Sequence, residues 1–300
     1  MKELKYLCNR EVMTMTHHKT IIFAIIIMIV ATLAAAVARA QCEMMFHSVD
    51  EQNGMSNEVV TCIEVDAFGY VWIGTKTGLE RYDGLSFVQM SSSKYKKTLN
   101  TAIGNSVADI KRDLDDNIWI ATEKGVSRFD IYTDRFAFIP RHGTVGVVND
   151  KSYQADNLYV DNDNNTYYFS QYHGLHKYES ASGLFRPVFN VFFRNHEIRY
   201  CHKDSSDCFW MLSEKENTIY KVDINGVILR TIPCGDLGDK NPTKGSCCFL
   251  DNGDGNYFFG GDNGLIVYDE NKGVFHDFDA DIIETLPTQD IRSIFLDSRG

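Results

Sequence analysis

Residues Asp66–Asp83 read DAFGYVWIGTKTGLERYD, and this pattern returns four more times along the chain. The other copies are DLDDNIWIATEKGVSRFD at Asp113–Asp130, NDNNTYYFSQYHGLHKYE at Asn162–Glu179, a degraded copy from Asp204, and NGDGNYFFGGDNGLIVYD at Asn252–Asp269. Alignment on a large aromatic gives spacings of 47, 49, 42 and 48 residues between Trp72, Trp119, Tyr168, Trp210 and Phe258. A period in this range indicates an array of small repeated units.

Each copy can be interpreted as four short strands. The first copy predicts strands at Val59–Val65, Tyr70–Thr75, Leu79–Tyr82 and Ser86–Met90. Asp66–Gly69 supplies the first turn, and Gly78 supplies the second because glycine adopts a positive φ without cost in a tight hairpin. No segment after residue 41 keeps apolar residues at helical spacing for three turns, so the predicted fold class is all-β.

A four-stranded unit of this length, with an aromatic and a glycine at fixed offsets, is typical of a β-propeller blade. We expect the first strand to line the central channel and the aromatic to pack between neighbouring sheets. A β-sandwich, the alternative, would not need one aromatic at one offset in every unit. Asp290–Gly300 matches the start of a sixth copy. The prediction for residues 41–300 is therefore five blades and the start of a sixth, an incomplete ring from a longer protein or a truncated reading frame.

Residues 1–40 precede this array. The segment Ile21–Val37 is apolar apart from Thr32, and Ala38–Ala40 then provides a small-x-small site. This pattern predicts a secretory signal peptide that is cut after Ala40, and hence an exported protein. The competing interpretation is an uncleaved membrane anchor, although an apolar run of 17 residues is short for a membrane span.

The charge and the cysteines exclude some functions. The 300 residues hold 41 acidic and 30 basic side chains, a formal net charge of −11, which repels phosphate backbones and argues against a nucleic-acid partner. The part after residue 40 has seven cysteines without CxxC spacing, which favours small buried apolar residues over metal ligands. Cys247 and Cys248 would point to opposite faces of one strand, so we expect no bond between them.

Residues Gly54–Phe87, GMSNEVVTCIEVDAFGYVWIGTKTGLERYDGLSF, resemble the two-component regulator propeller repeat. The pattern of that family is a Gly-Leu-Ser-Asn start, an Asp-x-x-Gly turn, Trp-Ile-Gly-Thr, and a Gly-Leu-x-Arg-Tyr-Asp finish. The second copy is nearly as close, and the third and fifth keep the turns. The fourth departs from the pattern, because Glu216 and Asn217 replace the glycine. The resemblance covers essentially everything after residue 45.

This resemblance implies the periplasmic sensor of a hybrid two-component system. The full-length parent would be a homodimer anchored in the inner membrane, with further blades, a membrane span, a histidine kinase, a receiver and a DNA-binding module. The implied ligand is an oligosaccharide, and the implied output is control of glycan-utilisation genes by a phosphorelay. The present segment would then be no enzyme, would need no cofactor, and would meet the membrane only through its signal or a downstream span. Two alternatives stay open: a secreted lyase-type propeller enzyme, and a free-standing propeller that binds or scaffolds.

The sequence contains no clear set of catalytic residues or metal ligands. Its histidines are scattered over different strands and loops, and no motif places a nucleophile beside one of them. The run Asp161–Asn165 resembles a calcium loop but has Thr166 where a glycine is needed and Tyr172 where a bidentate acid is needed. A hairpin turn accounts for this run, so we predict no metal site.

A ligand is expected at the turns between the second and third strands, which lie on one face of a propeller. Their side chains differ from copy to copy, as on a binding surface carried by a repeated scaffold. The predicted ligand-binding residues are Lys76, Glu123, Lys124, Tyr172, His173, Asp262 and Asn263. Tyr172 and His173 are the first choice because an aromatic ring can stack on a sugar while its neighbour hydrogen-bonds the hydroxyls. For any single position, a solvated turn is the simpler explanation.

Overall fold

The computed structural model describes residues 54–56, 59–90, 106–142, 154–245, 247–278 and 289–296. The chain divides into two compact units, Met1–Ser48 and Val49–Gly300, and all described residues belong to the second. The predicted signal peptide, residues 1–40, lies outside the described residues.

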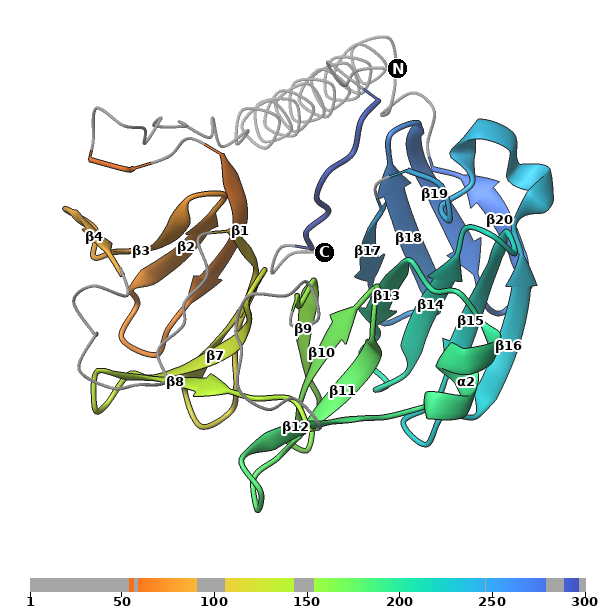
Figure 1. Ribbon diagram of the computed structural model, residues 1–300. Helices are drawn as coiled ribbons and strands as arrows, with labels where there is room; N and C mark the ends of the chain where they lie inside the picture. The colour runs from red at the N-terminus through yellow and green to blue at the C-terminus, as the bar shows by residue number, and fades with distance from the viewer. Residues whose placement is uncertain are drawn as a thin grey trace, which may run out of the picture. The chain divides into compact units, whose positions relative to one another are not determined.

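Within these ranges, twenty strands form five four-stranded antiparallel sheets (Figure 1). The first three sheets comprise β1 (Val60–Val65), β2 (Val71–Thr75), β3 (Gly78–Tyr82) and β4 (Phe87–Gln89); β5 (Val107–Arg112), β6 (Asn117–Thr122), β7 (Gly125–Asp130) and β8 (Arg135–Ile139); and β9 (Asn157–Val160), β10 (Thr166–Ser170), β11 (Gly174–Glu179) and β12 (Leu184–Pro187). The last two comprise β13 (Tyr200–Lys203), β14 (Phe209–Ser213), β15 (Thr218–Val222) and β16 (Ile228–Pro233); and β17 (Cys247–Asp251), β18 (Asn256–Gly261), β19 (Gly264–Asp269) and β20 (Val274–Asp277).

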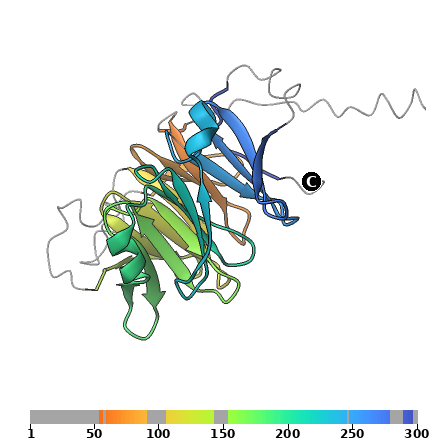
Figure 2. The ribbon, with the colours of Figure 1, turned by 90° about the vertical axis from the view of Figure 1, so that its right-hand side faces the viewer.

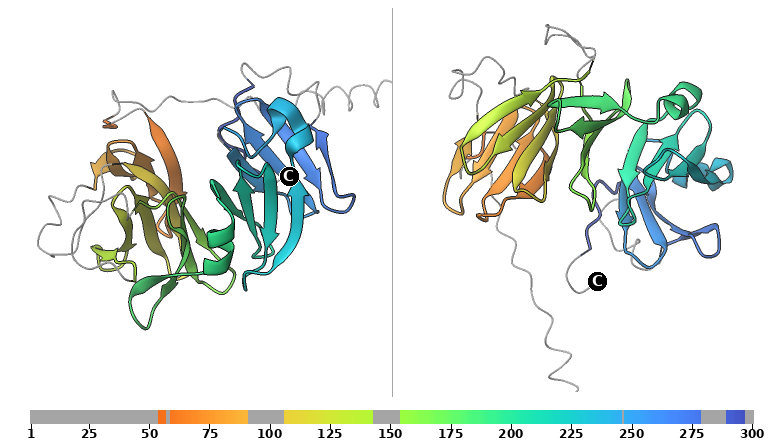
Figure 3. Two further views of the ribbon diagram at one scale, coloured as in Figure 1. Left: turned by 45° about the vertical axis from the view of Figure 1, so that its right-hand side comes forward. Right: turned by 90° about the horizontal axis from the view of Figure 1, so that it is seen from below.

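Each sheet is one sequence repeat, because its four strands are adjacent in chain order. The sheets follow one another from the orange β1–β4 sheet to the blue β17–β20 sheet (Figures 2 and 3). The labelled first strands β1, β9, β13 and β17 lie on the inner side of their sheets, and β4, β16 and β20 lie on the outer side (Figure 1). This arrangement confirms the prediction of an all-β, propeller-like fold built from four-stranded blades.

One aromatic from each of the first four blades packs against the next blade. Trp72 packs among Ile110, Ile118 and Phe129 of the second blade, and its ring lies 4.9 Å from that of Phe129. The equivalent Trp210 is fully buried, with its ring 4.2 Å from that of Tyr257 in the fifth blade. The repeated aromatic therefore forms the core between blades, and we call these residues the wedge aromatics.

The wedge aromatic of the third blade is Tyr167, so the predicted alignment on Tyr168 is wrong by one residue. The Tyr167 side chain packs on the fourth blade, where its ring lies 5.4 Å from that of Phe209. Tyr168 instead faces back toward the second blade and belongs to the same cluster as Trp119. Successive residues of a strand point to opposite faces of the sheet, so a shift of one residue exchanges the two faces.

A buried aspartate six residues before the wedge aromatic holds both the turn and the ring. Asp66 accepts hydrogen bonds from the backbone N–H groups of Phe68 and Tyr70 at 2.9 and 3.0 Å, and from Trp72 Nε1 at 2.8 Å. The same three-bond pattern recurs at Asp113, Asp161 and Asp204. These residues therefore form a structural hub of each blade, as well as the turn that the sequence predicted.

In each of the first four blades, a cation of the third strand lies over the ring of the wedge aromatic. Arg81, Arg128, Lys177 and Lys221 lie 5.1–5.7 Å from the ring centres of their wedge aromatics. In the fifth blade Phe258 pairs across the sheet with Val267, and Asn252 stands six residues before it. Phenylalanine has no ring N–H or O–H to donate, and its blade lacks both the aspartate and the cation. In the fifth blade the positions of the aspartate, the wedge aromatic and the cation therefore all differ from those of the other four blades.

The start of a predicted sixth repeat packs against the fifth blade. Ile291 donates its backbone N–H to the Gly261 carbonyl at 2.9 Å. A Cβ on Gly260 would lie 2.7 Å from the Ile291 side chain, just as one on Gly74 would lie 2.7 Å from Val107 of the second blade. Ile291 therefore occupies the place of Val107, but residues 290–296 form no strand with a described partner.

Protonation of His176 is expected to destabilise the fold in acid. This buried residue of β11 stacks on Tyr168 with ring centres 4.7 Å apart. Burial, aided by the positive charge of Arg141, lowers its pKa to about 3, against about 6.5 in an unfolded chain. Above pH 6.5 the residue is neutral in both states; as pH falls from 6.5 toward 3, only the unfolded state takes up the proton, so stability is lost.

We therefore expect the unfolding free energy of His176→Gln to fall less than that of the parent when the pH is lowered from 7 to 4.5. The difference between the two proteins should grow by up to about 1.4 kcal/mol for each pH unit below 6.5. Urea unfolding of both proteins across this range measures the difference. Other acid-sensitive groups, including His202, are present in both proteins and cancel. Parallel pH profiles for the two proteins would contradict the assignment.

Candidate functional site

The turn between the second and third strands is longer in the third and fourth blades than in the others. Thr75 pairs with Gly78, Thr122 with Gly125, and Gly261 with Gly264, which leaves turns of two residues in the first, second and fifth blades. In the third blade Ser170 pairs with Gly174, and in the fourth Ser213 pairs with Thr218. These blades therefore have turns of three residues, Gln171–His173, and four residues, Glu214–Asn217.

The connection from β12 to β13 carries a short helix, α2 (Asn190–Asn195), beside these turns. Its Phe192 is buried and meets Tyr220 of β15, with ring centres 5.5 Å apart. Its Phe193 lies over Gly174, which has φ +76°, and a Cβ there would lie 2.7 Å from the Phe193 ring. A glycine is thus required both by the turn and by the close approach of α2.

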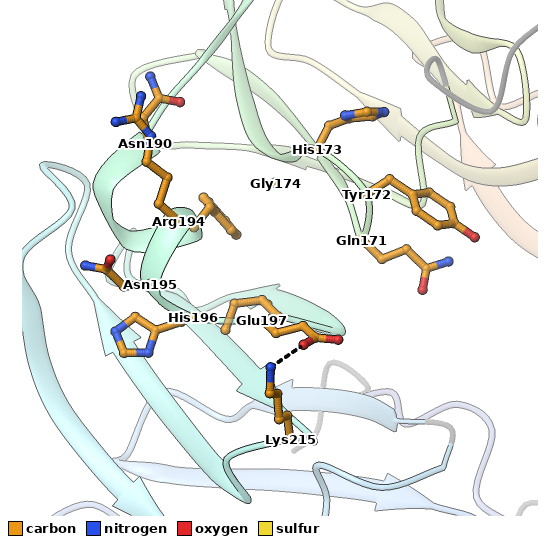
Figure 4. Close-up of a pocket in the computed structure, with 12 residues that line it drawn as sticks. Gln171, Tyr172, His173, Gly174, Asn190, Arg194, Asn195, His196, Glu197 and Lys215 are labelled. Carbon is orange, nitrogen blue, oxygen red and sulfur yellow. Dashed lines mark hydrogen bonds and ion pairs between the residues drawn. The ribbon is translucent and has the colours of Figure 1, made fainter.

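The two long turns and α2 line an open pocket of about 510 Å³ (Figure 4). Its lining consists of Gln171, Tyr172, His173, Gly174, Asn190, Phe193, Arg194, Asn195, His196, Glu197, Ile198 and Lys215. Gln171 and Tyr172 lie on one side, and Asn190 and Arg194 of α2 lie on the other (Figure 4). A second cavity of about 350 Å³ shares Tyr172 and Lys215 with the first and continues toward Arg199 and Glu214. The volume is that of a small-molecule site.

Most charges around the pocket are paired. Lys215 Nζ lies 3.2 Å from Glu197 Oε2, and Arg199 pairs with Glu214. Both side chains of the Lys215–Glu197 pair are about three-quarters exposed, 73% and 74%, so this pair contributes little to stability and is free to rearrange around a ligand.

Beside the pocket, Glu216 is held in its ionised form by two neighbours. Its carboxylate accepts hydrogen bonds from Tyr220 and interacts with His196 Nδ1 at 3.1 Å. Burial alone would raise the pKa of Glu216, but these two interactions outweigh it and lower the pKa. Burial and the same hydrogen bond raise the pKa of Tyr220 to about 12. The long turn of the fourth blade is therefore anchored to α2 and β15.

The structure brings together only some of the predicted ligand-binding residues. Tyr172 and His173 both line the pocket, and Tyr172 is 53% exposed. Asp262 and Asn263 line a separate space of about 20 Å³ in the fifth blade, which holds little more than a water molecule.

Lys76, Glu123 and Lys124 line none of these cavities. Two of the predicted residues have structural partners instead: Asn263 donates to the Asp239 carbonyl at 2.9 Å, and Glu123 accepts from the Ser106 backbone N–H at 2.9 Å. The seven predicted residues therefore occupy equivalent turns, but they do not form one site.

Sequence reasoning missed the α2 side of the pocket. Because no segment after residue 41 shows helical spacing over three turns, the sequence predicts no helix at residues 190–196. The run NVFFRN is shorter than two helical turns, too short for a periodic pattern to show. The adjacent aromatics Phe192 and Phe193 were the available signal, because two large apolar residues in a polar connection need burial.

The described residues contain no catalytic centre that we can recognise. His173 and His196 line the pocket, and His142, His176, His202 and His276 lie in other strands and loops. His176 is buried with a pKa of about 3. Within the same ranges, no group of three or more His, Cys, Asp or Glu side chains could hold a metal ion. Asp161 uses its carboxylate for the turn and for Tyr167. Among the described helices, none is both long and apolar enough to cross a membrane.

Residues 54–77 match the sequence profile of the family described as "Two component regulator propeller". No curated protein matches the chain. Among solved structures, the chain is similar to the extracellular domains of BT3049 and BT4673 from B. thetaiotaomicron, each described as a hybrid two component system. For BT3049 the identity is 17% and the TM-score 0.61, over 77% of this chain and 31% of that one. For BT4673 the identity is 14% and the TM-score 0.51, over 85% of this chain and 40% of that one.

The chain is also similar to a catalytically inactive virginiamycin B lyase from Staphylococcus aureus, at 14% identity and a TM-score of 0.55, over 79% of this chain and 74% of that one. The chain spans well under half the length of the two hybrid-system domains that it matches. At such identities a structural likeness shows the fold, and the profile match adds the type of repeat. The described residues therefore have a propeller-like fold, and residues 54–77 match the profile of the two component regulator propeller.

Proposed function

We propose that this chain is the periplasmic ligand-sensing propeller of a hybrid two-component regulator, and that its ligand is an oligosaccharide bound in the pocket between the third and fourth blades. The proposal rests on how the backbone is built around the pocket. The pocket lies where the turn between the second and third strands is lengthened in two neighbouring blades and where α2 is inserted, whereas the same turn has two residues in the first, second and fifth blades. Added loops on a rigid repeat are where binding sites are commonly built.

The lining residues support this ligand class. Tyr172 offers an exposed ring on which a sugar can stack, and Gln171, Asn190 and Asn195 offer amide groups for hydroxyls. The similarity to sensor ectodomains supports the same class of function. Homodimerisation, a membrane anchor, the phosphorelay and control of glycan-utilisation genes would be properties of the full-length parent.

In this proposal the ligand signals by its difference in affinity for two arrangements of the ectodomain. A ligand can shift an equilibrium only as far as that difference allows. The pocket is suited to such a role because its walls come from two blades and from the connection between them. A change in the position of α2 would then be passed to both blades.

The test is titration of the purified protein with a panel of oligosaccharides by calorimetry. We expect at least one to bind, and Tyr172→Ala to weaken its binding about tenfold, which corresponds to about 1.4 kcal/mol. Tyr132→Ala is the matched control, because Tyr132 is 66% exposed and lies outside the pocket. Failure of every oligosaccharide to bind, or equal losses from the two substitutions, would count against the proposal.

A further inference from the structure

Arg194 differs from the other cations at the pocket in having no acidic partner. Lys215 pairs with Glu197, and Arg199 pairs with Glu214. Throughout the described part of the chain, no carboxylate forms an ion pair with Arg194, although it lines the pocket. This guanidinium is therefore the charge at the site that a ligand could neutralise.

The position of Arg194 suits contact with a ligand. It follows Asn190 by four residues on α2, so both side chains lie on one face of the helix. Figure 4 shows the Arg194 side chain running beside Asn190, across the pocket from Tyr172 and Gln171. A ligand that stacks on Tyr172 would therefore reach the guanidinium and the Asn190 amide at its far end.

Building on the proposed function, we propose that this pocket selects an oligosaccharide that carries an anionic group, a carboxylate or a sulfate ester, and that Arg194 binds this group. A planar guanidinium can donate two parallel hydrogen bonds to either group. A neutral sugar in the same place would remove water from the guanidinium without giving it a counter-charge, which is unfavourable.

The recognition must be local, because the protein as a whole repels anions. Its formal net charge is −11, and at physiological salt a charge acts over only about 8 Å. The Lys215–Glu197 and Arg199–Glu214 pairs are internally neutral and give no preference for either sign, and the ionised Glu216 beside the pocket adds no attraction for an anion. The preference for an anion therefore depends on Arg194 alone, and one substitution should remove it.

The experiment compares three trisaccharides of one backbone by calorimetry: a uronic acid form, its neutral carboxyl-reduced form, and a sulfated form of the neutral sugar. We expect the uronic acid form, the sulfated form, or both to bind at least about tenfold more tightly than the neutral form. Comparison of the uronic acid form with the sulfated form identifies which anionic group the pocket prefers. Arg194→Gln should abolish this advantage, with the loss of affinity falling on the anionic sugars.

Arg135→Gln is the matched control, because Arg135 is an exposed arginine of β8 in the second blade. It should preserve the full preference, and the unfolding midpoints of both variants should equal that of the parent. Equal affinity for the neutral and anionic sugars would overturn this inference and leave the proposed function standing. An anionic preference that survives Arg194→Gln would overturn the role of Arg194. Binding of none of the three, nor of any wider panel, would overturn both proposals.

Discussion

Trp210→Ala is expected to lower the free energy of unfolding by about 3–5 kcal/mol, the usual cost of truncating a fully buried Trp. The indole is 0% exposed, and its ring meets the ring of Tyr257 at 4.2 Å in the next blade. Its Nε1 donates to Asp204 at 2.9 Å. The substitution therefore removes the packing between two blades and also leaves a buried carboxylate oxygen without its partner.

Urea unfolding monitored by circular dichroism gives the measurement. Trp210→Phe helps to separate the two contributions, because it keeps a buried aromatic ring while it loses the donor and part of the indole volume. It should cost clearly less than Trp210→Ala. If Trp210→Ala cost under about 1 kcal/mol, the wedge aromatics could not be the main contacts between blades.

Lys221→Ala is expected to cost about 3 kcal/mol, because it breaks a buried ion pair. Lys221 Nζ lies 2.8 Å from Glu270 Oε1, 3.0 Å from the Tyr257 hydroxyl and 3.5 Å from Asp204 Oδ2. The lysine side chain is 8% exposed, and that of Asp204 is fully buried. Burial alone would raise the pKa of Glu270, but the hydrogen bonds from Lys221 and Tyr257 outweigh it and lower the pKa. Without the lysine, Asp204 loses its counter-charge, and Glu270 keeps only that of Arg230, which lies 3.1 Å away.

Two variants control this prediction. Lys272→Ala removes a lysine that also contacts a carboxylate, at 2.7 Å, but that is 74% exposed, and it should cost less than about 1 kcal/mol. Lys221→Met combined with Glu270→Leu removes both charges and should cost less than Lys221→Ala alone, because Glu270, which loses its buried partner in Lys221→Ala, is removed as well. If the double variant were the less stable of the two, the lysine would not act by neutralising this acid.

The repeat alone was sufficient to predict the blades. The strands of the first repeat were predicted to within one residue at each end, because the turn residues and the buried aromatic recur at fixed distances. The third repeat shows where a pattern is insufficient. Tyr167 and Tyr168 are adjacent aromatics, and Asp161 and Asn162 are adjacent turn formers. Only the packing of Tyr167 on the fourth blade decides between the two alignments.

The candidate site was predictable on one side only. Tyr172 and His173 could be chosen because they stand at a turn position that varies among the repeats. Arg194 and Asn190 could not, because they depend on α2, a helix of six residues. Helices this short are not stable by propensity, and this one is held by contacts of Phe192 and Phe193 with residues distant in sequence.

Hydrogen exchange with and without bound oligosaccharide tests the central claim most directly. The ligand would be the one that binds most tightly in the titrations. The account predicts slower exchange in peptides covering residues 171–174, 190–198 and 214–217. It predicts no change at the equivalent short turns, residues 75–78 and 122–125. The account would be contradicted if the ligand slowed exchange at those short turns, or at the aspartate turns of residues 66–70 and 113–117, and left exchange in α2 unchanged.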